Sequence, residues 1–257
     1  MFINNFDPIA FNFFSLEIRW YSLSYIFGII LAWFYCKKFL VKNKNELKIF
    51  DDLISYLIIG IIIGGRFGYV IFYNPFYFIK NPIEILMLWN GGMSFHGAII
   101  GILVSTIVFA KKNNEDAFYL LDLVAVTAPI GIFLGRIANF INSELYGRVT
   151  DVFWSVKFIK VDDLSRHPSQ IYEALCEGLI LFFLLNFFYK KYWKKTGVVS
   201  SFFVIIYSLF RFCLEYSREP DSHLGFLYFN LTMGQILSII FIIIGFTLFF
   251  FRNDAQK

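Results

Sequence analysis

Long apolar segments separated by short polar ones run through almost the whole chain. A helix needs about 20 apolar residues to cross a hydrocarbon core about 30 Å thick, and segments of this length recur. We expect membrane spans at residues 20–36, 53–73, 94–110, 118–141, 171–189, 198–216 and 231–251. The pattern predicts an all-α polytopic membrane protein with about seven transmembrane helices, whose two termini face opposite sides of the bilayer.

Two stretches depart from this pattern. In residues 143–169 charged and apolar residues alternate, so we expect a small outward-facing subdomain with short strands, inserted into a single transmembrane domain over residues 1–257. Residues 82–89 are too short to span, and we expect them along the outer interface, where Trp89 suits the headgroup region. The first apolar run is not expected to be a cleaved signal peptide, because its lysines follow it and no small-residue cleavage site appears. This run should therefore remain as a spanning helix.

Composition agrees with the membrane assignment. Hydrophobic residues make up 58% of the 257 positions and charged residues 16%, whereas an average soluble domain has about 25% charged residues. The net charge of +4 is spread over short clusters between apolar segments, so nucleic acid is not an expected partner. Three cysteines lie inside apolar runs without metal-ligand spacing, so we expect no metal and treat them as core residues.

The distribution of cations predicts the orientation. Thirteen Lys and Arg residues fall on one side of the seven spans, and seven fall on the other: Arg19, Lys80, Arg148, Lys157, Lys160, Arg166 and Arg218. Cytoplasmic loops carry the excess of cations in membrane proteins. We therefore expect an N-terminus that faces out and a C-terminus that faces the cytoplasm.

Three arginines lie deep inside apolar runs, where a guanidinium costs at least about 2.5 kcal/mol. A rise of 1.5 Å per residue places Arg66 and Arg211 roughly 20 Å, and Arg136 roughly 27 Å, from the cytoplasmic ends of their helices. Tyr21 and His96 open two further spans on the same, outer side. Each arginine could instead pair with a glutamate or with helix-end carbonyls. A common depth on separate helices favours one shared anion, such as a phospholipid phosphate.

Spacing within the helices adds two expectations. Tyr207, Arg211, Glu215 and Arg218 should form one stripe, in which Glu215 would hold Arg211 in place; that pairing would also explain Arg211 without a ligand. Glycines four residues apart favour close helix packing and no chemistry of their own. They occur at Gly60, Gly64 and Gly68, at Gly97 and Gly101, and at Gly131 and Gly135.

The three histidines differ as candidates for a catalytic role. His96 opens a span near the expected arginines, and nearby positive charge favours the neutral imidazole that a general base needs. A hydrogen-bonded scaffold role is the alternative for this residue. His167 fits a turn that begins the fifth span, and no role is assigned to His223.

One long polar motif resembles a known family. The run Gly135-Arg136-Ile137-Ala138-Asn139-Phe140-Ile141-Asn142-Ser143-Glu144-Leu145-Tyr146-Gly147-Arg148 closely resembles the signature of bacterial prolipoprotein diacylglyceryl transferases. Further matching motifs follow in order along nearly the whole chain: Phe6-Asp7-Pro8, Arg19-Trp20-Tyr21, Gly64-Gly65-Arg66-Phe67-Gly68-Tyr69-Val70, Gly91-Gly92-Met93-Ser94-Phe95-His96-Gly97, Arg166-His167-Pro168-Ser169-Gln170 and Met233-Gly234-Gln235. Ala138 and Ser22 stand where the family commonly has glycine.

The resemblance implies an enzyme of the bacterial inner membrane with seven spans and a site facing the periplasm. Such an enzyme moves diacylglycerol from phosphatidylglycerol to the lipobox cysteine of a prolipoprotein, without a cofactor, and releases glycerol phosphate. Carried over by motif position, the family's functional residues fall on Tyr21, His96, Arg136, Asn139, Glu144, Gly147 and Arg211.

Within that reading, we expect Arg136 and Arg211, with Arg66 beside them, at the lipid phosphate. His96 or Tyr21 would handle the thiol proton, and Asn139 and Glu144 would orient the headgroup. Two other function classes compete: a transporter or channel for an anionic solute, and a lipid-binding scaffold without catalysis. The transporter reading lacks the inverted repeat and the broken central helices that such sites often use.

Overall fold

A computed structural model describes residues 2–14, 16–41, 43–72, 75–88, 91–220 and 225–254. Trp89 and His223 lie outside these residues. The chain divides into two compact units, one made of residues 1–36 and 122–257 and the other of residues 37–121. Each unit is described below by itself.

All seven segments expected to span the membrane are helical. The helices are α1 (Trp20–Tyr35), α2 (Lys44–Phe72), α4 (Phe95–Asn113), α5 (Ala117–Asn142), α6 (Ser169–Glu173) with α7 (Leu181–Tyr192), α8 (Val198–Leu214) and α9 (Met233–Asp254). Two π-helical turns, Cys36–Leu40 and Ala174–Ile180, continue α1 and join α6 to α7. In the described residues, five helices are long and apolar enough to cross a membrane: Trp20–Leu40, Lys44–Phe72, Ala117–Asn142, Ser169–Tyr192 and Met233–Asn253. Val198–Leu214 is apolar but shorter.

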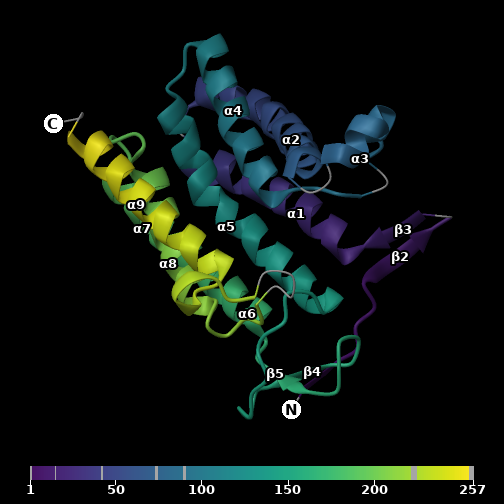
Figure 1. Cartoon of the computed structure of the whole chain (residues 1–257). Coiled ribbons are helices and arrows are strands. Elements are labelled where there is room, and N and C mark those ends of the chain that lie inside the picture. Colours follow the sequence, from purple (N-terminus) through teal and green to yellow (C-terminus); the bar gives the residue numbers. More distant parts are fainter. Residues whose placement is uncertain are drawn as a thin grey trace. The chain divides into compact units, whose positions relative to one another are not determined.

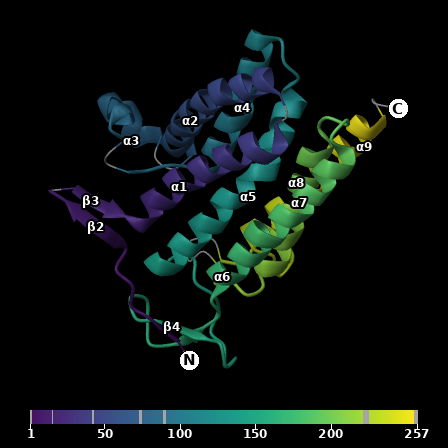
Figure 2. The ribbon, with the colours of Figure 1, turned by 180° about the vertical axis from the view of Figure 1, so that it is seen from behind.

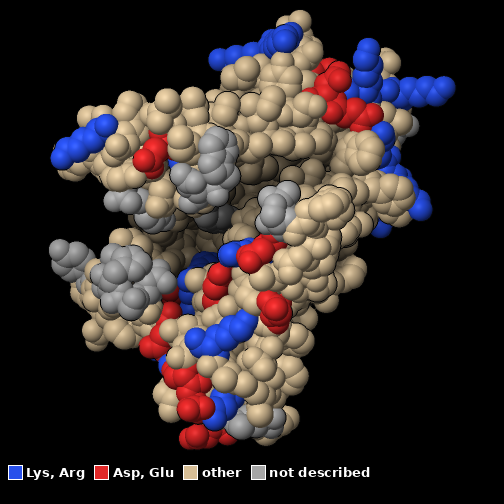
Figure 3. All heavy atoms as spheres, turned by 90° about the vertical axis from the view of Figure 1, so that its right-hand side faces the viewer, with Lys and Arg blue, Asp and Glu red and all other residues tan. Residues whose placement is uncertain are grey.

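The helices expose large apolar side chains, as membrane helices do. Phe27, Ile30 and Phe34 of α1 are about half exposed, and α9 exposes a similar series. Figure 3 shows broad areas without charged residues, while acidic and basic side chains gather at the top and at the bottom of the view. Apolar surface on this scale is unfavourable in water and favourable in lipid.

In the unit formed by residues 1–36 and 122–257, α7, α8 and α9 lie side by side (Figures 1 and 2). Two glycines permit close contacts with α5. A Cβ on Gly178 would lie 2.7 Å from Cβ of Phe133, and a Cβ on Gly28 would lie 3.0 Å from Cα of Gly131. The π-helical turn and α1 therefore approach α5 at backbone distance.

Short strands add to the helices. Strand β4 (Val156–Phe158) pairs with β5 (Ser165–Arg166), which confirms the expectation of strands in residues 143–169. Strand β1 (Phe2–Asn4) pairs in parallel with β4, and β2 (Ile9–Phe13) with β3 (Leu16–Arg19) forms a hairpin before α1. These N-terminal strands correct the all-α expectation. Local sequence could not reveal β1, because its partner lies more than 150 residues away.

In the unit of residues 37–121, α2 and α4 pack through glycines as their spacing predicted. A Cβ on Gly60 would lie 2.6 Å from Oγ of Ser105, and one on Gly68 would lie 2.7 Å from Cα of Gly97. On α5 the prediction holds only for Gly131, which lies against Gly28 of α1 as described above. A Cβ on Gly135 would meet no atom within 4 Å.

The segment between α2 and α4 forms short helices, α3 (Pro75–Lys80) and a 3₁₀ turn, Pro82–Leu86. Phe76, Ile79 and Ile83 in it are more than two-thirds exposed. An apolar surface of this kind agrees with the interfacial position expected for residues 82–89, which stays a prediction.

Candidate functional site

A cluster of ion pairs lies at the centre of the larger unit, which is formed by residues 1–36 and 122–257. Arg136, in the last third of α5, contacts two glutamates of the α6–α7 segment. Its Nε and Nη2 donate to Oε2 of Glu177 at 3.2 and 2.8 Å, and its Nη1 lies 3.0 Å from Oε2 of Glu173. Because Glu173 and Glu177 are four residues apart, both carboxylates face α5.

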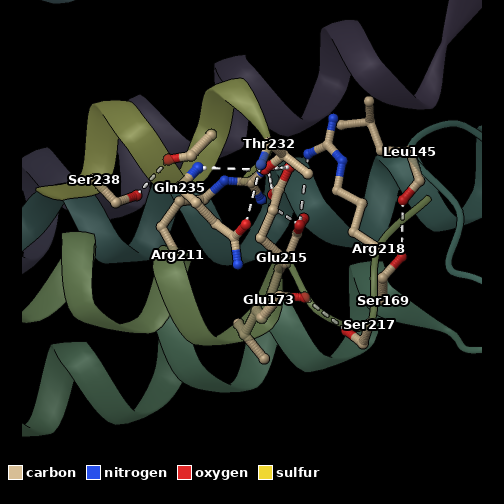
Figure 4. Close-up of polar contacts among 12 residues, drawn as sticks. Leu145, Ser169, Glu173, Arg211, Glu215, Ser217, Arg218, Thr232, Gln235 and Ser238 are labelled. Carbon is tan, nitrogen blue, oxygen red and sulfur yellow. Dashed lines mark hydrogen bonds and ion pairs between the residues drawn. The ribbon is translucent and has the colours of Figure 1, made fainter. Parts of the chain in front are cut away.

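Arg211 of α8 enters the same cluster (Figure 4). Its Nη1 donates to Oε1 of Glu173 at 2.5 Å, and its Nη2 lies 2.5 Å from Oε2 of Glu215. The expected pairing of Arg211 with Glu215 is therefore confirmed. Arg218, expected on the same helical stripe, lies beyond the end of α8 and reaches Glu173 at 3.6 Å. The stripe is broken at Leu214, yet Arg218 still joins the cluster through Glu173.

Glu215 is also held from α9. The Thr232 hydroxyl donates to Oε1 of Glu215 at 3.0 Å, and a Cβ on Gly234 would lie 2.9 Å from the same oxygen. Gln235 and Thr232 cap the start of α9 by exchanging backbone and side-chain bonds, as in a capping box. The motif Met233-Gly234-Gln235 therefore brings α9 against the carboxylate that orients Arg211.

The arginines form the accessible side of this cluster. The side chains of Glu173 and Glu177 are 0% exposed, whereas those of Arg136 and Arg211 are each 15% exposed. Arg136, Arg211 and Arg218 carry three positive charges, and Glu173, Glu177 and Glu215 carry three negative ones, so the formal charges cancel. An anion that enters would meet the guanidinium groups before the carboxylates.

Sequence reasoning missed Glu173 and Glu177. It treated pairing with glutamate as the alternative to an anionic ligand, and the structure contains that pairing. The available signal was the presence of two carboxylates four residues apart inside an apolar span, because acidic groups at membrane depth are rare and usually paired. Their pairing gives the arginines counter-charges without removing them from the accessible surface.

Asn139 and Glu144 lie together next to the cluster. Nδ2 of Asn139 donates to Oε2 of Glu144 at 3.1 Å, and Nδ2 of Asn142 donates to Oε1 at 3.4 Å. Gly147 is a site of close backbone approach, since a Cβ there would lie 2.7 Å from the Ser217 carbonyl oxygen. Gly147 thus joins the segment after α5 to the segment after α8.

Two tyrosines of α1 reach the same region. The hydroxyls of Tyr21 and Tyr25 are 3.1 Å apart, and Tyr25 lies close enough to Arg136 and Glu144 for electrostatic interaction. Tyr207 on α8 interacts in the same way with Glu177, Arg136 and Arg211. The structure therefore brings the candidates Tyr21, Tyr207, Arg136, Arg211, Asn139, Glu144 and Glu215 into one part of the larger unit.

Arg66 and His96 belong to the unit of residues 37–121. All five N–H donors of Arg66 bond backbone carbonyls at 2.5–3.3 Å, namely those of Glu84, Ile85, Met87, Gly91 and Gly92. This is the carbonyl pairing considered as the alternative, and it leaves Arg66 without a donor for a phosphate. His96 lies in the first turn of α4 and is exposed.

Charged groups outside the helices follow ordinary electrostatics. Hydrogen bonds from Arg166 hold the pKa of the Asp162 carboxyl below its usual value, and burial lowers the pKa of His167. Among the described residues, no three His, Cys, Asp or Glu side chains are grouped as metal ligands. The arginine cluster has the charge and the fixed donors to bind a phosphate or another oxyanion.

Comparison with known proteins agrees with this chemistry. A family model described as prolipoprotein diacylglyceryl transferase matches residues 8–251. The phosphatidylglycerol–prolipoprotein diacylglyceryl transferase of Rickettsia typhi is 50% identical over 249 residues, which cover 95% of this chain and 96% of that protein. The protein of the same name from Ehrlichia canis is 50% identical over 247 residues, covering 93% of this chain and 94% of that protein. This chain therefore belongs to the prolipoprotein diacylglyceryl transferase family.

Proposed function

We propose that this chain transfers the diacylglyceryl group of phosphatidylglycerol to the lipobox cysteine thiol of prolipoproteins. The product is a thioether, and glycerol phosphate is released. Family membership supports the reaction class, and the relatives' names supply phosphatidylglycerol and prolipoprotein as substrates. The observation that carries the proposal is that Arg136 and Arg211, each 15% exposed, form the accessible side of a cluster whose glutamates Glu173 and Glu177 are fully buried.

The lipid phosphate binds to Arg136 and Arg211. In the reaction the cysteine sulfur forms a bond to the glycerol carbon that bears the phosphate ester. The carbon–oxygen bond breaks, and its electron pair leaves on the glycerol phosphate. Negative charge therefore grows on the phosphate in the transition state, and preorganised donors aimed at that charge can supply several kcal/mol, roughly 3–4 for a single donor.

The carboxylates of Glu173, Glu177 and Glu215 orient the two arginines. Flexible guanidinium groups would have to be ordered during binding, which costs about 2 kcal/mol of rotamer entropy per side chain. Ion pairs at 2.5–3.0 Å remove most of that freedom beforehand. Arg66 is left out of the phosphate site because its donors are already used, and we assign it to holding the backbone at residues 84–87 and 91–92.

The remaining candidates bind the headgroup or handle the proton. Asn139 and Glu144 orient the terminal glycerol, because a carboxylate and an amide suit hydroxyl groups. A thiol with a pKa near 8.5 is mostly protonated at neutral pH, so the substrate cysteine must lose its proton. His96 accepts that proton, and Tyr21 assists by hydrogen bonding.

We also propose that seven helices cross the bacterial inner membrane, with the N-terminus in the periplasm and the C-terminus in the cytoplasm. The excess of cations on one side of the helices supports this orientation. Residues 143–169 and the active site would then face the periplasm, where the lipobox of an exported protein is accessible.

The test is turnover by purified protein with labelled phosphatidylglycerol and a lipobox peptide. Wild-type protein should release glycerol phosphate and add the diacylglyceryl mass to the peptide. Arg136→Ala should abolish transfer, while Ser200→Ala, at the opposite end of α8, should not change it. Movement of lipid or glycerol phosphate across vesicles without modified peptide would favour transport, and bound lipid without either result would favour a scaffold.

His96→Gln separates the two roles considered for this histidine. A glutamine can donate and accept hydrogen bonds but cannot take the thiol proton at neutral pH. If His96 is the general base, transfer should fall about 100-fold or more. A rate close to that of the wild type would show that hydrogen bonding suffices.

A further inference from the structure

The turn that carries Glu144 has a strained backbone. Ser143 has φ of +59° and Leu145 has φ of +55°, so the residues on both sides of Glu144 are left-handed. Residues with a Cβ rarely adopt this conformation, because the Cβ then crowds the carbonyl oxygen. Two such residues separated by one position persist only when their surroundings hold them.

Two consecutive residues at the start of α6 hold this turn. Nε2 of Gln170 donates to the Glu144 carbonyl at 2.6 Å, and the Ser169 hydroxyl donates to the Leu145 carbonyl at 2.8 Å. Figure 4 shows the Ser169 hydroxyl directed at Leu145. Both donors are 0% exposed, so water does not compete for these bonds. On the other side, the Glu144 amide donates to the Asn139 carbonyl at 3.0 Å.

The result is a rigid backbone beneath an accessible carboxylate. The Glu144 residue is exposed, although the two carbonyls of its turn are bonded to buried side chains. Its carboxylate is further bonded by Asn139 and lies close enough to Tyr25 for electrostatic interaction, as Arg136 does. A charged group held in this way suits recognition of a substrate more than general solubility.

The side-chain amide of Gln170 lowers the stability of the protein except through its hydrogen bond to the Glu144 carbonyl. Its Oε1 is buried and has no hydrogen-bond partner among the described residues. A buried polar atom without a partner lowers stability. An apolar residue of similar size would avoid that cost, so the contribution of the amide lies in the bond from Nε2 to the Glu144 carbonyl.

We propose that Ser169 and Gln170 are positioning residues that hold the strained turn at residues 143–145 and so place the Glu144 carboxylate for the terminal glycerol of phosphatidylglycerol. The inference rests on the proposed function, in which Glu144 orients that glycerol. Neither residue touches the lipid. They act on selectivity for the headgroup through the backbone of Glu144.

The experiment compares binding of two lipids to detergent-solubilised protein. Phosphatidylglycerol carries the terminal glycerol, and phosphatidic acid presents a phosphate without it. Gln170→Glu keeps the size of the side chain but replaces the donor by an oxygen, and Ser169→Ala removes only the hydroxyl. Each variant should lose about 10-fold in its preference for phosphatidylglycerol, the effect of losing a hydrogen bond to a charged group. Affinity for phosphatidic acid should change less than about twofold on the same reasoning.

Coupling to Glu144 distinguishes positioning from general damage. In a Glu144→Gln background, adding Gln170→Glu or Ser169→Ala should change the lipid preference by less than about twofold, because the group they place is gone. Ser200→Ala is the matched serine control and should behave as the wild type does. If Gln170→Glu does not fold, Ser169→Ala carries the same comparison.

Three results with the variants would overturn the inference. They are an equal loss of affinity for both lipids, an additive loss in the Glu144→Gln background, and an unchanged preference in both single variants. A wild-type protein that transfers lipid but binds the two lipids equally would remove the headgroup role of Glu144 and this inference, and leave the transferase reaction standing. A wild-type protein without transfer would instead contradict the proposed function.

Discussion

Glu177→Gln should strongly destabilise the protein, because it removes a counter-charge from a buried guanidinium. Glu177 is 0% exposed and accepts two hydrogen bonds from Arg136, at 2.8 and 3.2 Å. Glutamine has nearly the same volume, so the change in charge dominates over any cavity. Breaking one side of a buried ion pair costs about 3–5 kcal/mol. For a chain of this length each kcal/mol lowers the unfolding midpoint by about 2–4 °C, so the expected decrease is about 6–20 °C.

Thermal unfolding in detergent measures this decrease, with Asp163→Asn as the matched control. Asp163 pairs with Lys157 at 2.8 Å but is 90% exposed, and exposed pairs contribute about 0–1 kcal/mol. Both substitutions replace a carboxylate by its amide. Equal midpoints for the two variants would refute the reasoning that Glu177 compensates a buried charge.

A lipid anion should partly restore the variant. The headgroup phosphate would supply the negative charge that Glu177→Gln removed, so added phosphatidylglycerol should bind the variant more tightly than the wild type. Ligand binding stabilises the folded state in proportion to affinity. The midpoint should therefore rise more in the variant than in the wild type. A smaller rise would place the bound phosphate away from Arg136.

Three further predictions concern other parts of the molecule. Gly178→Ala should destabilise by about 1–3 kcal/mol, because the new Cβ would lie 2.7 Å from that of Phe133, whereas Gly135→Ala, with no atom within 4 Å, should be tolerated in the same unfolding assay. The pKa of the Asp162 carboxyl is lowered in the folded state. Its contribution to stability should therefore be complete above the ordinary value of about 3.9 and disappear as the pH falls through the lowered pKa. The difference in unfolding midpoint between the wild type and Asp162→Asn, measured from pH 6 to pH 3, tests this direction. Arg66→Lys should speed hydrogen exchange in residues 84–88 and 91–92, because a lysine has three donors in place of five. Unchanged exchange would contradict the role of Arg66 in holding these residues.

Much of the fold was readable from local sequence. The lengths of the apolar segments located every long helix, because crossing the hydrocarbon core sets a minimum length that composition reveals directly. The glycine spacing on α2 and α4 predicted their close contact correctly. On α5 the same spacing was correct at Gly131, which lies against Gly28, and not at Gly135, because a small residue permits close packing without requiring it. The hairpin before α1 was missed, since strands near a membrane helix carry no strong pattern of their own.

The site was predicted in part. The motif after Gly135 singled out Arg136, Asn139 and Glu144, and the stripe on α8 led to Arg211 and Glu215. The partners of these residues were less visible. Glu173 and Glu177 are important because they contact Arg136 of α5 from the neighbouring α6–α7 segment. The sequence of that segment does not indicate which helix packs against it.

By itself, the sequence determined the membrane class, the helical segments, the family and the residue types available for chemistry. These properties depend on composition, periodicity and contiguous motifs, which are local. The tertiary structure decided which charges meet: Arg66 bonds carbonyls of the next loop, while Arg136 and Arg211 share Glu173. Carbonyls and carboxylates can each bond the donors of an arginine that is removed from water. An arginine in an apolar run therefore does not indicate which of the two kinds of partner it has. Only the packing of helices distant in sequence separates a structural clamp from a group that an anion can reach.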